Sequence, residues 1–146
     1  MRVHLLARAG RVVTWPRVGG LRALELGTPG ALRAELNRLV LAGDKQATAG
    51  LLSEYDEEGE ELEHVGERLA LVDDDGAHIG TVEVTGVEVT PFEGVPWSFA
   101  QAEGEGDADL ADWRAGHRRY WERVGTPVED QTPIVCLRFR LVGPPA

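Results

Sequence analysis

Residues 79–90 most constrain what this chain can fold into, because their apolar alternation changes phase at a glycine. Valines occupy one parity before Gly86 and the opposite parity after it: Val82 and Val84, then Val87 and Val89. Alternate side chains of a strand point to opposite faces, so the phase change predicts a bulge or a corner in one long strand. Sheets bent in this way often close on themselves, and we therefore expect a small β-barrel.

Two other stretches are expected to form strands. In the stretch that opens at Gly66, residues 69–72 are apolar at both parities, which predicts a strand buried on both faces. A turn at 73–76 follows, in which Gly76 supplies a positive φ. Residues 134–142 alternate apolar residues with arginines, which is typical of a strand with one solvated face.

Two helices are expected to flank these strands. The first spans residues 29–42, with Thr28 as its N-cap and Gly43 as its left-handed terminator. The second spans residues 110–124 and begins after the N-cap Asp109. Apolar and aromatic residues recur on it at helical spacing: Leu110, Trp113, His117, Tyr120, Trp121 and Val124. Strands and helices in separate segments indicate an α+β fold.

Charge is distributed unevenly along the chain. The formal net charge is -10, yet residues 1–24 contain five arginines and no acidic residue. We interpret residues 1–20 as an irregular basic N-terminal arm and residues 21–146 as one domain. The acidic run 54–63 is interpreted as a solvated loop. A domain this acidic is repelled by bulk nucleic acid, so no DNA duplex is expected as a partner, and a small or weakly charged ligand is favoured.

The location of the protein is inferred from two negative features. Cys136 is the single cysteine, so the chain contains no internal disulfide, which is compatible with a reducing compartment. No apolar run approaches the roughly 20 residues of a membrane span, and the N-terminus makes a poor secretory signal. We expect a cytoplasmic protein without a membrane partner; the sequence does not fix its oligomeric state.

The only lysine of the chain, Lys45, follows directly after the helix terminator Gly43. Lysine can lose its proton, act as a nucleophile or place a compact positive charge, and arginine cannot do the first two. Thr48 adds a hydroxyl three residues later. The alternative interpretation is structural: a surface lysine just beyond a helix C-terminus is favoured by the helix dipole. The residues alone leave both interpretations open.

Three acidic residues alternate with glycines at 103–107: Glu103, Glu105 and Asp107. Three carboxylates this close could bind a hard cation such as Mg²⁺ or Mn²⁺. They could also hold one carboxyl group with a raised pKa that serves as a general acid or base. The alternative is a solvated loop whose charges complement the dipole of the following helix. No dinucleotide, phosphate-loop or zinc motif is present, so a divalent metal is the only cofactor that the residues suggest.

Two residues near this run have a structural and a functional interpretation. His117 lies on the apolar stripe of the second helix, where it is either a packed core residue or a side chain facing the same cavity as Glu103 and Glu105. Trp97 is either a core residue or a platform on which a base stacks.

Two stretches together resemble a known family. Gly43-Asp44-Lys45-Gln46-Ala47-Thr48 resembles the GxKxxT motif of the ASCH domain family. The run 102–107, followed by Trp113-Arg114 and His117, resembles the EGEGD…WR..H signature of the larger ASCH subgroup. The resemblance covers roughly residues 24–142.

The resemblance implies a PUA-like fold, which is a small β-barrel flanked by helices, and an association with RNA. Some members of the family are ribonucleases, and others hydrolyse N4-acetylcytidine with the Lys and Thr of the motif and a Glu. On that analogy Lys45 and Thr48 are catalytic, and Glu103 or Glu105 supplies the carboxylate.

We therefore expect a hydrolase that acts on RNA, resembling a ribonuclease. Arg114, His117 and Trp97 would contact the substrate, and Glu103, Glu105 and Asp107 would hold any metal. The alternatives are an amidohydrolase of N4-acetylcytidine-type nucleosides and a module that binds RNA or a nucleotide without catalysis.

Overall fold

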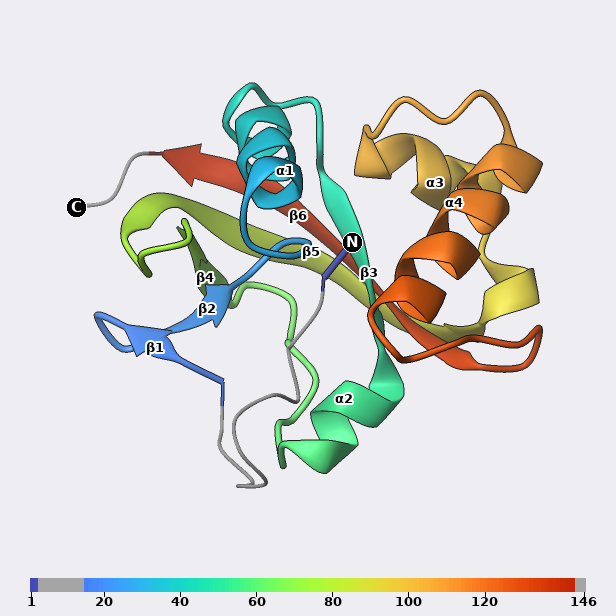
Figure 1. The fold of residues 1–146 in the computed structure, drawn as a ribbon. Coiled ribbons are helices and arrows are strands. Elements are labelled where there is room, and N and C mark those ends of the chain that lie inside the picture. The colour runs from blue at the N-terminus through green and yellow to red at the C-terminus, as the bar shows by residue number, and fades with distance from the viewer. Residues whose placement is uncertain (3–14, 144–146) are drawn as a thin grey trace.

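A computed structural model describes residues 1–2 and 15–143 of the chain. The elements follow one another in this order (Figure 1): β1 (Arg17–Val18), β2 (Leu21–Leu24), α1 (Ala31–Leu41), β3 (Ala47–Leu51), α2 (Leu52–Glu57), β4 (Arg68–Val72), β5 (His78–Pro91), the 3-10 helix η1 (Phe92–Gly94), α3 (Trp97–Glu103), α4 (Leu110–Arg123) and β6 (Pro133–Gly143). Among the described residues, no helix has the length and apolar character needed to cross a bilayer.

The strands form one six-stranded sheet with the order β1-β2-β4-β5-β6-β3. Neighbouring strands are antiparallel, except that β2 and β4 run parallel. Within the described ranges, β1 and β3 are the edges of the sheet and do not pair with each other, so the sheet is open. The α+β class is therefore confirmed, whereas closure of the sheet into a barrel is not.

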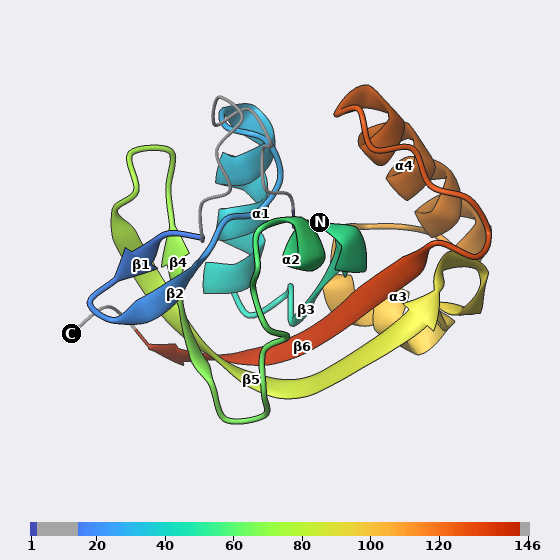
Figure 2. The same cartoon turned by 90° about the horizontal axis from the view of Figure 1, so that it is seen from below.

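The phase change at Gly86 is a bulge in the longest strand pair, β5 with β6. Val84 pairs with Phe139 and Gly86 pairs with Arg138, so Thr85 is an extra residue opposite two consecutive residues of β6. Such a residue bends the strand and increases its twist. Figure 2 shows β5 and β6 as a long curved pair whose concave side faces α1. The corner predicted from the valine pattern is confirmed.

Strand β3 runs between two groups of helices, with α1 on one side and α3 and α4 on the other (Figures 1 and 2). One core cluster joins β3 to α3 and α4, and its members include Ala47, Ala49, Phe99, Trp113, Tyr120 and Trp121. A second cluster joins α1 to the sheet, and its members include Leu36, Val40, Leu69, Val82 and Leu137. The connection from α1 to β3 therefore passes between the two clusters, and this connection carries Lys45.

The two long helices agree with prediction to different degrees. Helix α4 begins as expected, with the Asp109 side chain accepting a hydrogen bond from the Asp112 backbone N–H. The N-cap predicted for α1 is wrong, because Gly30 and not Thr28 precedes its first residue. Gly30 has a φ of 104°, which its missing Cβ permits, and its N–H donates to the Asp74 carboxylate instead of closing a local cap.

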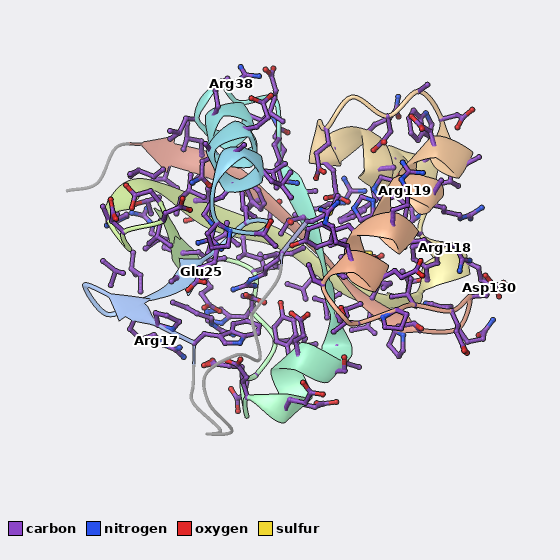
Figure 3. The ribbon with its side chains drawn as sticks, in the orientation of Figure 1. Arg17, Glu25, Arg38, Arg118, Arg119 and Asp130 are labelled. Carbon is purple, nitrogen blue, oxygen red and sulfur yellow. The ribbon has the colours of Figure 1, made fainter. Side chains whose placement is uncertain are left out.

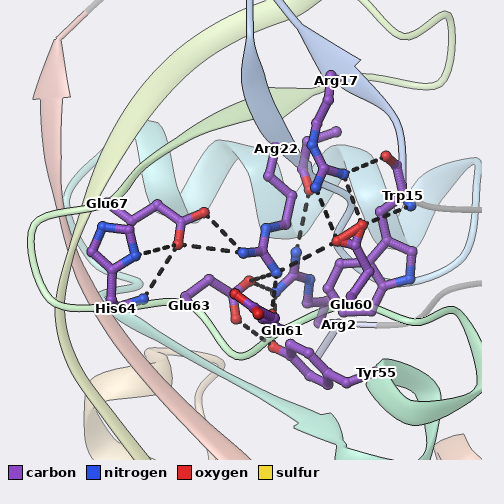
Figure 4. Close-up of polar contacts among 11 residues, drawn as sticks. Arg2, Trp15, Arg17, Arg22, Tyr55, Glu60, Glu61, Glu63, His64 and Glu67 are labelled. Carbon is purple, nitrogen blue, oxygen red and sulfur yellow. Dashed lines mark hydrogen bonds and ion pairs between the residues drawn. The ribbon is translucent and has the colours of Figure 1, made fainter.

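Two ion pairs, one buried and one partly exposed, replace the solvated loop expected at 54–63 (Figure 4). Arg2 donates to the Glu63 carboxylate and to the Tyr55 hydroxyl, and all three side chains are buried. Arg17 forms a two-pronged pair with Glu60, at 2.9 and 3.0 Å. These partners lie 43 to 61 residues apart in sequence, so the local composition of the acidic run could not reveal them.

The arm predicted over residues 1–20 is corrected in its described part. Trp15 is buried beneath the Arg2 guanidinium, which lies 4.3 Å from the centre of its ring. Arg17 and Val18 pair with β2 as an edge strand. Residues 15–20 therefore belong to the sheet and its core. Residues 3–14 of the predicted arm lie outside the described residues.

Replacing Glu63 by glutamine is expected to destabilise the fold by about 3 kcal/mol, because Arg2 would keep a buried charge without its counter-ion. Chemical denaturation of the two proteins measures the difference. Glu35→Gln is the matched control, since Glu35 pairs with Arg38, which lies on the exposed side of α1 (Figure 3), where an ion pair contributes little to stability.

The loss in Glu63→Gln is also expected to depend on pH. Burial raises the pKa of Glu63, but Arg2 and the hydrogen bonds from Arg2 and Tyr55 outweigh it, so the net pKa is lowered. A lowered folded-state pKa gives stability that is complete above the unfolded value of about 4.3 and is lost as pH falls through the folded value. The difference in unfolding free energy between the wild type and Glu63→Gln should therefore become smaller at acidic pH. If Glu63→Gln lost no more stability than Glu35→Gln at neutral pH, the stabilising role of the buried Arg2–Glu63 pair would be contradicted.

Candidate functional site

Lys45 lies in a short connection that three elements hold in place. The backbone N–H groups of Asp44 and Lys45 both donate to Leu39 O at the end of α1. The next residue, Gln46, donates to Ala102 O of α3 and accepts from Phe139 N of β6. These bonds draw the lysine between α1, α3 and the sheet, where 1% of its surface is exposed. The interpretation of Lys45 as a surface residue beyond a helix end is therefore wrong.

The Lys45 ammonium group is surrounded by oxygen acceptors. It donates to Ala47 O at 2.7 Å, to Glu103 Oε2 at 3.1 Å and to Glu105 Oε2 at 2.7 Å. The backbone amino nitrogen of Met1 lies 3.0 Å from the same Glu105 oxygen. Lysine and both carboxylates thus form one cluster, called the Lys45 cluster below.

Helix α4 completes the surroundings of Glu103, which has no exposed surface. The Trp113 indole N–H donates to Glu103 Oε1 at 2.8 Å, and His117 Nε2 lies 3.2 Å from the same oxygen. Nδ1 of His117 is 2.9 Å from Trp113 O, and the two rings stack with their centres 4.0 Å apart. Because a carbonyl can only accept, His117 Nδ1 carries a proton, and Nε2 is the ring nitrogen that faces Glu103.

The glycines of the acidic run have a steric function. Gly104 ends α3 with a φ of 64°, and a Cβ placed there would lie 2.1 Å from Asp44 O and 3.1 Å from Lys45 Cα. Only glycine lets the two backbones approach this closely. The approach places the last residue of α3, Glu103, and its neighbour Glu105 against the lysine.

Electrostatics keep the cluster ionised. Burial lowers the pKa of Lys45, but the Glu105 and Glu103 carboxylates reverse this effect, so the net pKa of the lysine is raised. Burial raises the pKa of Glu103, and the Lys45 ammonium, the Met1 amino group and His117 instead hold it well below its usual range. At neutral pH Lys45 is a fixed positive charge and not a nucleophile.

The structure brings together some of the predicted site residues. Lys45, Glu103 and Glu105 converge, and His117 joins them from α4. Thr48 lies on β3, where its hydroxyl is buried and forms no hydrogen bond with the part of the chain that is described.

The metal-ligand set predicted from the sequence differs from the set that the structure brings together. The group of potential ligands within reach of one ion is Glu103, Glu105 and His117, whose nearest donor atoms all lie within 4.8 Å of one another. Asp107 is not part of this group. Partial burial raises its pKa, with Glu105 contributing and His117 opposing.

The remaining predicted contacts serve the packing of the domain. The Arg114 guanidinium donates to Glu93 O at 2.6 Å, which ties α4 to η1. Trp97 packs partly buried against the core cluster at the start of α3. In the described ranges, neither side chain forms a hydrogen bond or ion pair with the Lys45 cluster.

Two residues of the site were missed by sequence reasoning. Trp113 was assigned to the apolar stripe and to the family signature, and Gly104 to the run of alternating acids and glycines, so neither was given a contact with Glu103 or Lys45. The available signal was the spacing of Trp113 and His117, because residues i and i+4 of a helix lie on one face and can reach the same acceptor.

These features describe a small α+β domain in which one lysine, held by carboxylates, is buried where the sheet meets two helices. A family model for the ASCH domain matches residues 23–143. The chain therefore belongs to the ASCH domain family, a family of PUA-like domains. No match was found among curated proteins.

Solved structures support the same assignment. A protein from Enterococcus faecalis V583 is 28% identical over 82% of this chain and 75% of its own, with a TM-score of 0.71. The ASCH domain from Lactobacillus crispatus JV V101 is also 28% identical, over 82% of this chain and 77% of its own, with a TM-score of 0.70. An ASCH protein from Zymomonas mobilis, a mutant form, shares the fold at 15% identity, over 73% of this chain and 63% of its own, with a TM-score of 0.50.

Replacing Gly104 by alanine is expected to destabilise the protein by at least about 2 kcal/mol more than replacing Gly106. Both glycines have a positive φ, so both substitutions carry the left-handed penalty of about 1–2 kcal/mol. Only the Gly104 methyl group meets another backbone, whereas a Cβ at Gly106 meets nothing within 4 Å. Urea denaturation of both variants tests this, and equal losses would show that the close approach is not needed.

Proposed function

We propose that this ASCH domain is a hydrolase of acylated nucleosides, and that it removes an acyl group of the N4-acetylcytidine type. The family resemblance suggests the substrate class. The observation that carries the proposal is a fully charged lysine held by two carboxylates inside the fold. Such a cluster can stabilise an oxyanion and accept a proton from water, which are the two needs of amide hydrolysis.

The residues would divide this work as follows. Lys45 places its charge where negative charge develops on the carbonyl oxygen as water attacks. Glu105 retains 10% of its side-chain exposure and is the carboxylate nearest to entering water, so it takes the proton. Glu103 is fully buried and bonded to Trp113, and it orients Lys45. The products are the free acid and the nucleoside with its amine restored.

Thr48 has an unused hydrogen-bonding group. A buried hydroxyl without a partner costs about 1–3 kcal/mol, and a bound substrate that supplies a partner recovers this energy. Thr48 is therefore assigned to substrate binding.

The ribonuclease-like activity expected from the sequence is the second candidate, and it would depend on a metal. Two carboxylates and an imidazole fit Mn²⁺, and His117 Nε2 lies 3.2 Å from Glu103 Oε1, so both atoms could reach one cation. A bound metal would activate water for attack on phosphate. The Trp113 N–H already donates to Glu103 Oε1, however, and Lys45 and the Met1 amino group already hold Glu105 Oε2, so a metal would have to compete with these contacts. The acidic net charge of -10 also opposes a long RNA strand, so the geometry favours the deacylase.

Thr48→Val is expected to lower kcat/KM for N4-acetylcytidine about 5- to 30-fold, which is the effect of about 1–2 kcal/mol of lost hydrogen bonding. The same change should leave stability in urea unchanged or slightly raised, because the hydroxyl has no partner in the free protein. Thr48→Ser keeps the hydroxyl and is the matched control. Full activity in Thr48→Val, or no hydrolysis by the wild type, would refute the assignment.

Removing metal separates the two candidate functions. The deacylase should keep its activity after dialysis against EDTA, since Lys45 supplies the positive charge. RNA cleavage that is abolished by EDTA and restored by Mn²⁺, together with no deacylation, would instead support the nuclease. His117→Gln should then weaken Mn²⁺ binding, which can be measured by titration independently of turnover.

A further inference from the structure

A second pocket lies over strands β5 and β6, beside α3. Its volume is about 260 Å³, and its lining includes Gly86 and Glu88 from β5, Cys136 and Arg138 from β6, and Phe99 from α3. Val65, whose surface is 67% exposed, stands at its rim. Pockets for whole drug-sized ligands measure roughly 300–1,000 Å³, so this one suits a single ring system.

The bulge in β5 creates this space. Gly86 pairs with Arg138 and Glu88 pairs with Cys136, so these four residues share one face of the sheet. Gly86 contributes no side chain to that face. A Cβ there would lie 3.7 Å from the Arg138 side chain, which is ordinary contact, so the empty position opens the pocket beside the arginine.

Two opposite charges line the pocket without pairing. Among the described residues, neither the Glu88 carboxylate nor the Arg138 guanidinium forms a hydrogen bond or an ion pair, and the guanidinium lies 5.4 Å from the centre of the Phe99 ring. A nearby pair on the same two strands behaves differently, since Arg140 donates to Glu83 at 2.8 Å. The pocket therefore presents a free acceptor and a free donor across an open, partly apolar space.

We propose that this pocket binds one guanine base, from an RNA strand or a free nucleotide. The guanine O6 and N7 atoms accept the paired hydrogen bonds that arginine donates, as in the commonest contact to this base. Its N1–H and N2–H₂ groups donate to the Glu88 carboxylate.

Glu88 also selects against other occupants. Adenine has an amino group where Arg138 needs an acceptor, and it has no hydrogen on N1 for the carboxylate. A phosphate group is repelled by Glu88, so the base and not the phosphate enters. The inference rests on the proposed recognition of nucleosides or RNA, but it does not require hydrolysis at the Lys45 cluster.

Protein-observed NMR titration with GMP, AMP and CMP tests the proposal on the intact chain. GMP should shift the amide signals of residues 86–88 and 136–138 in a saturable way, with an affinity at least 10-fold higher than that of AMP or CMP. A short single-stranded RNA with one guanosine should shift the same signals. Its affinity, compared with that of GMP, distinguishes an RNA strand from a free nucleotide as the ligand. Equal affinity for the three nucleotides, or shifts confined to the Lys45 cluster, would overturn the inference.

Three variants sharpen the test. Glu88→Gln and Arg138→Gln should each weaken GMP binding at least 10-fold, whereas Glu83→Gln, on the same strand outside the pocket, should not. Gly86→Val should fill the pocket and abolish binding while the amide spectrum stays folded. Unchanged GMP affinity in Glu88→Gln or Gly86→Val would refute the site.

The outcome is separable from that of the proposed function. Glu88→Gln should keep wild-type hydrolysis of N4-acetylcytidine, because Glu88 is not part of the Lys45 cluster. Guanine binding without deacylation would leave this inference standing and remove the deacylase.

Discussion

The buried ion pair between Lys45 and Glu103 is the interaction on which the rest of the structure depends. Neither group has exposed side-chain surface, and a buried charge is tolerated only when it is paired and hydrogen-bonded. The pair therefore fixes the connection before β3 against the end of α3, and Trp113 and His117 add α4 to the same point. Gly104 makes this junction sterically possible. The groups proposed for catalysis are thus the groups that hold the two core clusters together.

A second buried ion pair, Arg2 with Glu63, also fixes distant segments of the chain together. It joins residue 2 to the acidic segment after α2, while Arg17 and Glu60 join that segment to the first edge strand. Much of the acidic charge in this chain is therefore used internally. The excess that gives the net charge of -10 remains outside, and it favours a small ligand over a long polyanion.

Features with a local physical cause could be predicted from the sequence. The bulge at Gly86 follows from the parity of four valines, and the start of α4 follows from the Asp109 side chain. Features that depend on a distant partner could not. Thr28 is a good cap by composition, but the N–H of Gly30 finds Asp74, 44 residues away. The acids at 54–63 looked solvated because their arginines lie elsewhere in the chain.

The sequence by itself determined the α+β class, the bent long strand, the faces of the helices and the candidacy of Lys45, Glu103 and Glu105. Each of these depends on periodicity, capping or residue type, which act over a few neighbouring positions. Only the tertiary structure decided that Lys45 is buried and charged, that His117 and not Asp107 completes the potential metal-ligand group, and that Glu88 and Arg138 share a pocket. Burial and ion pairing depend on which segments, distant in sequence, come into contact, and these contacts are determined by the packing of the whole chain.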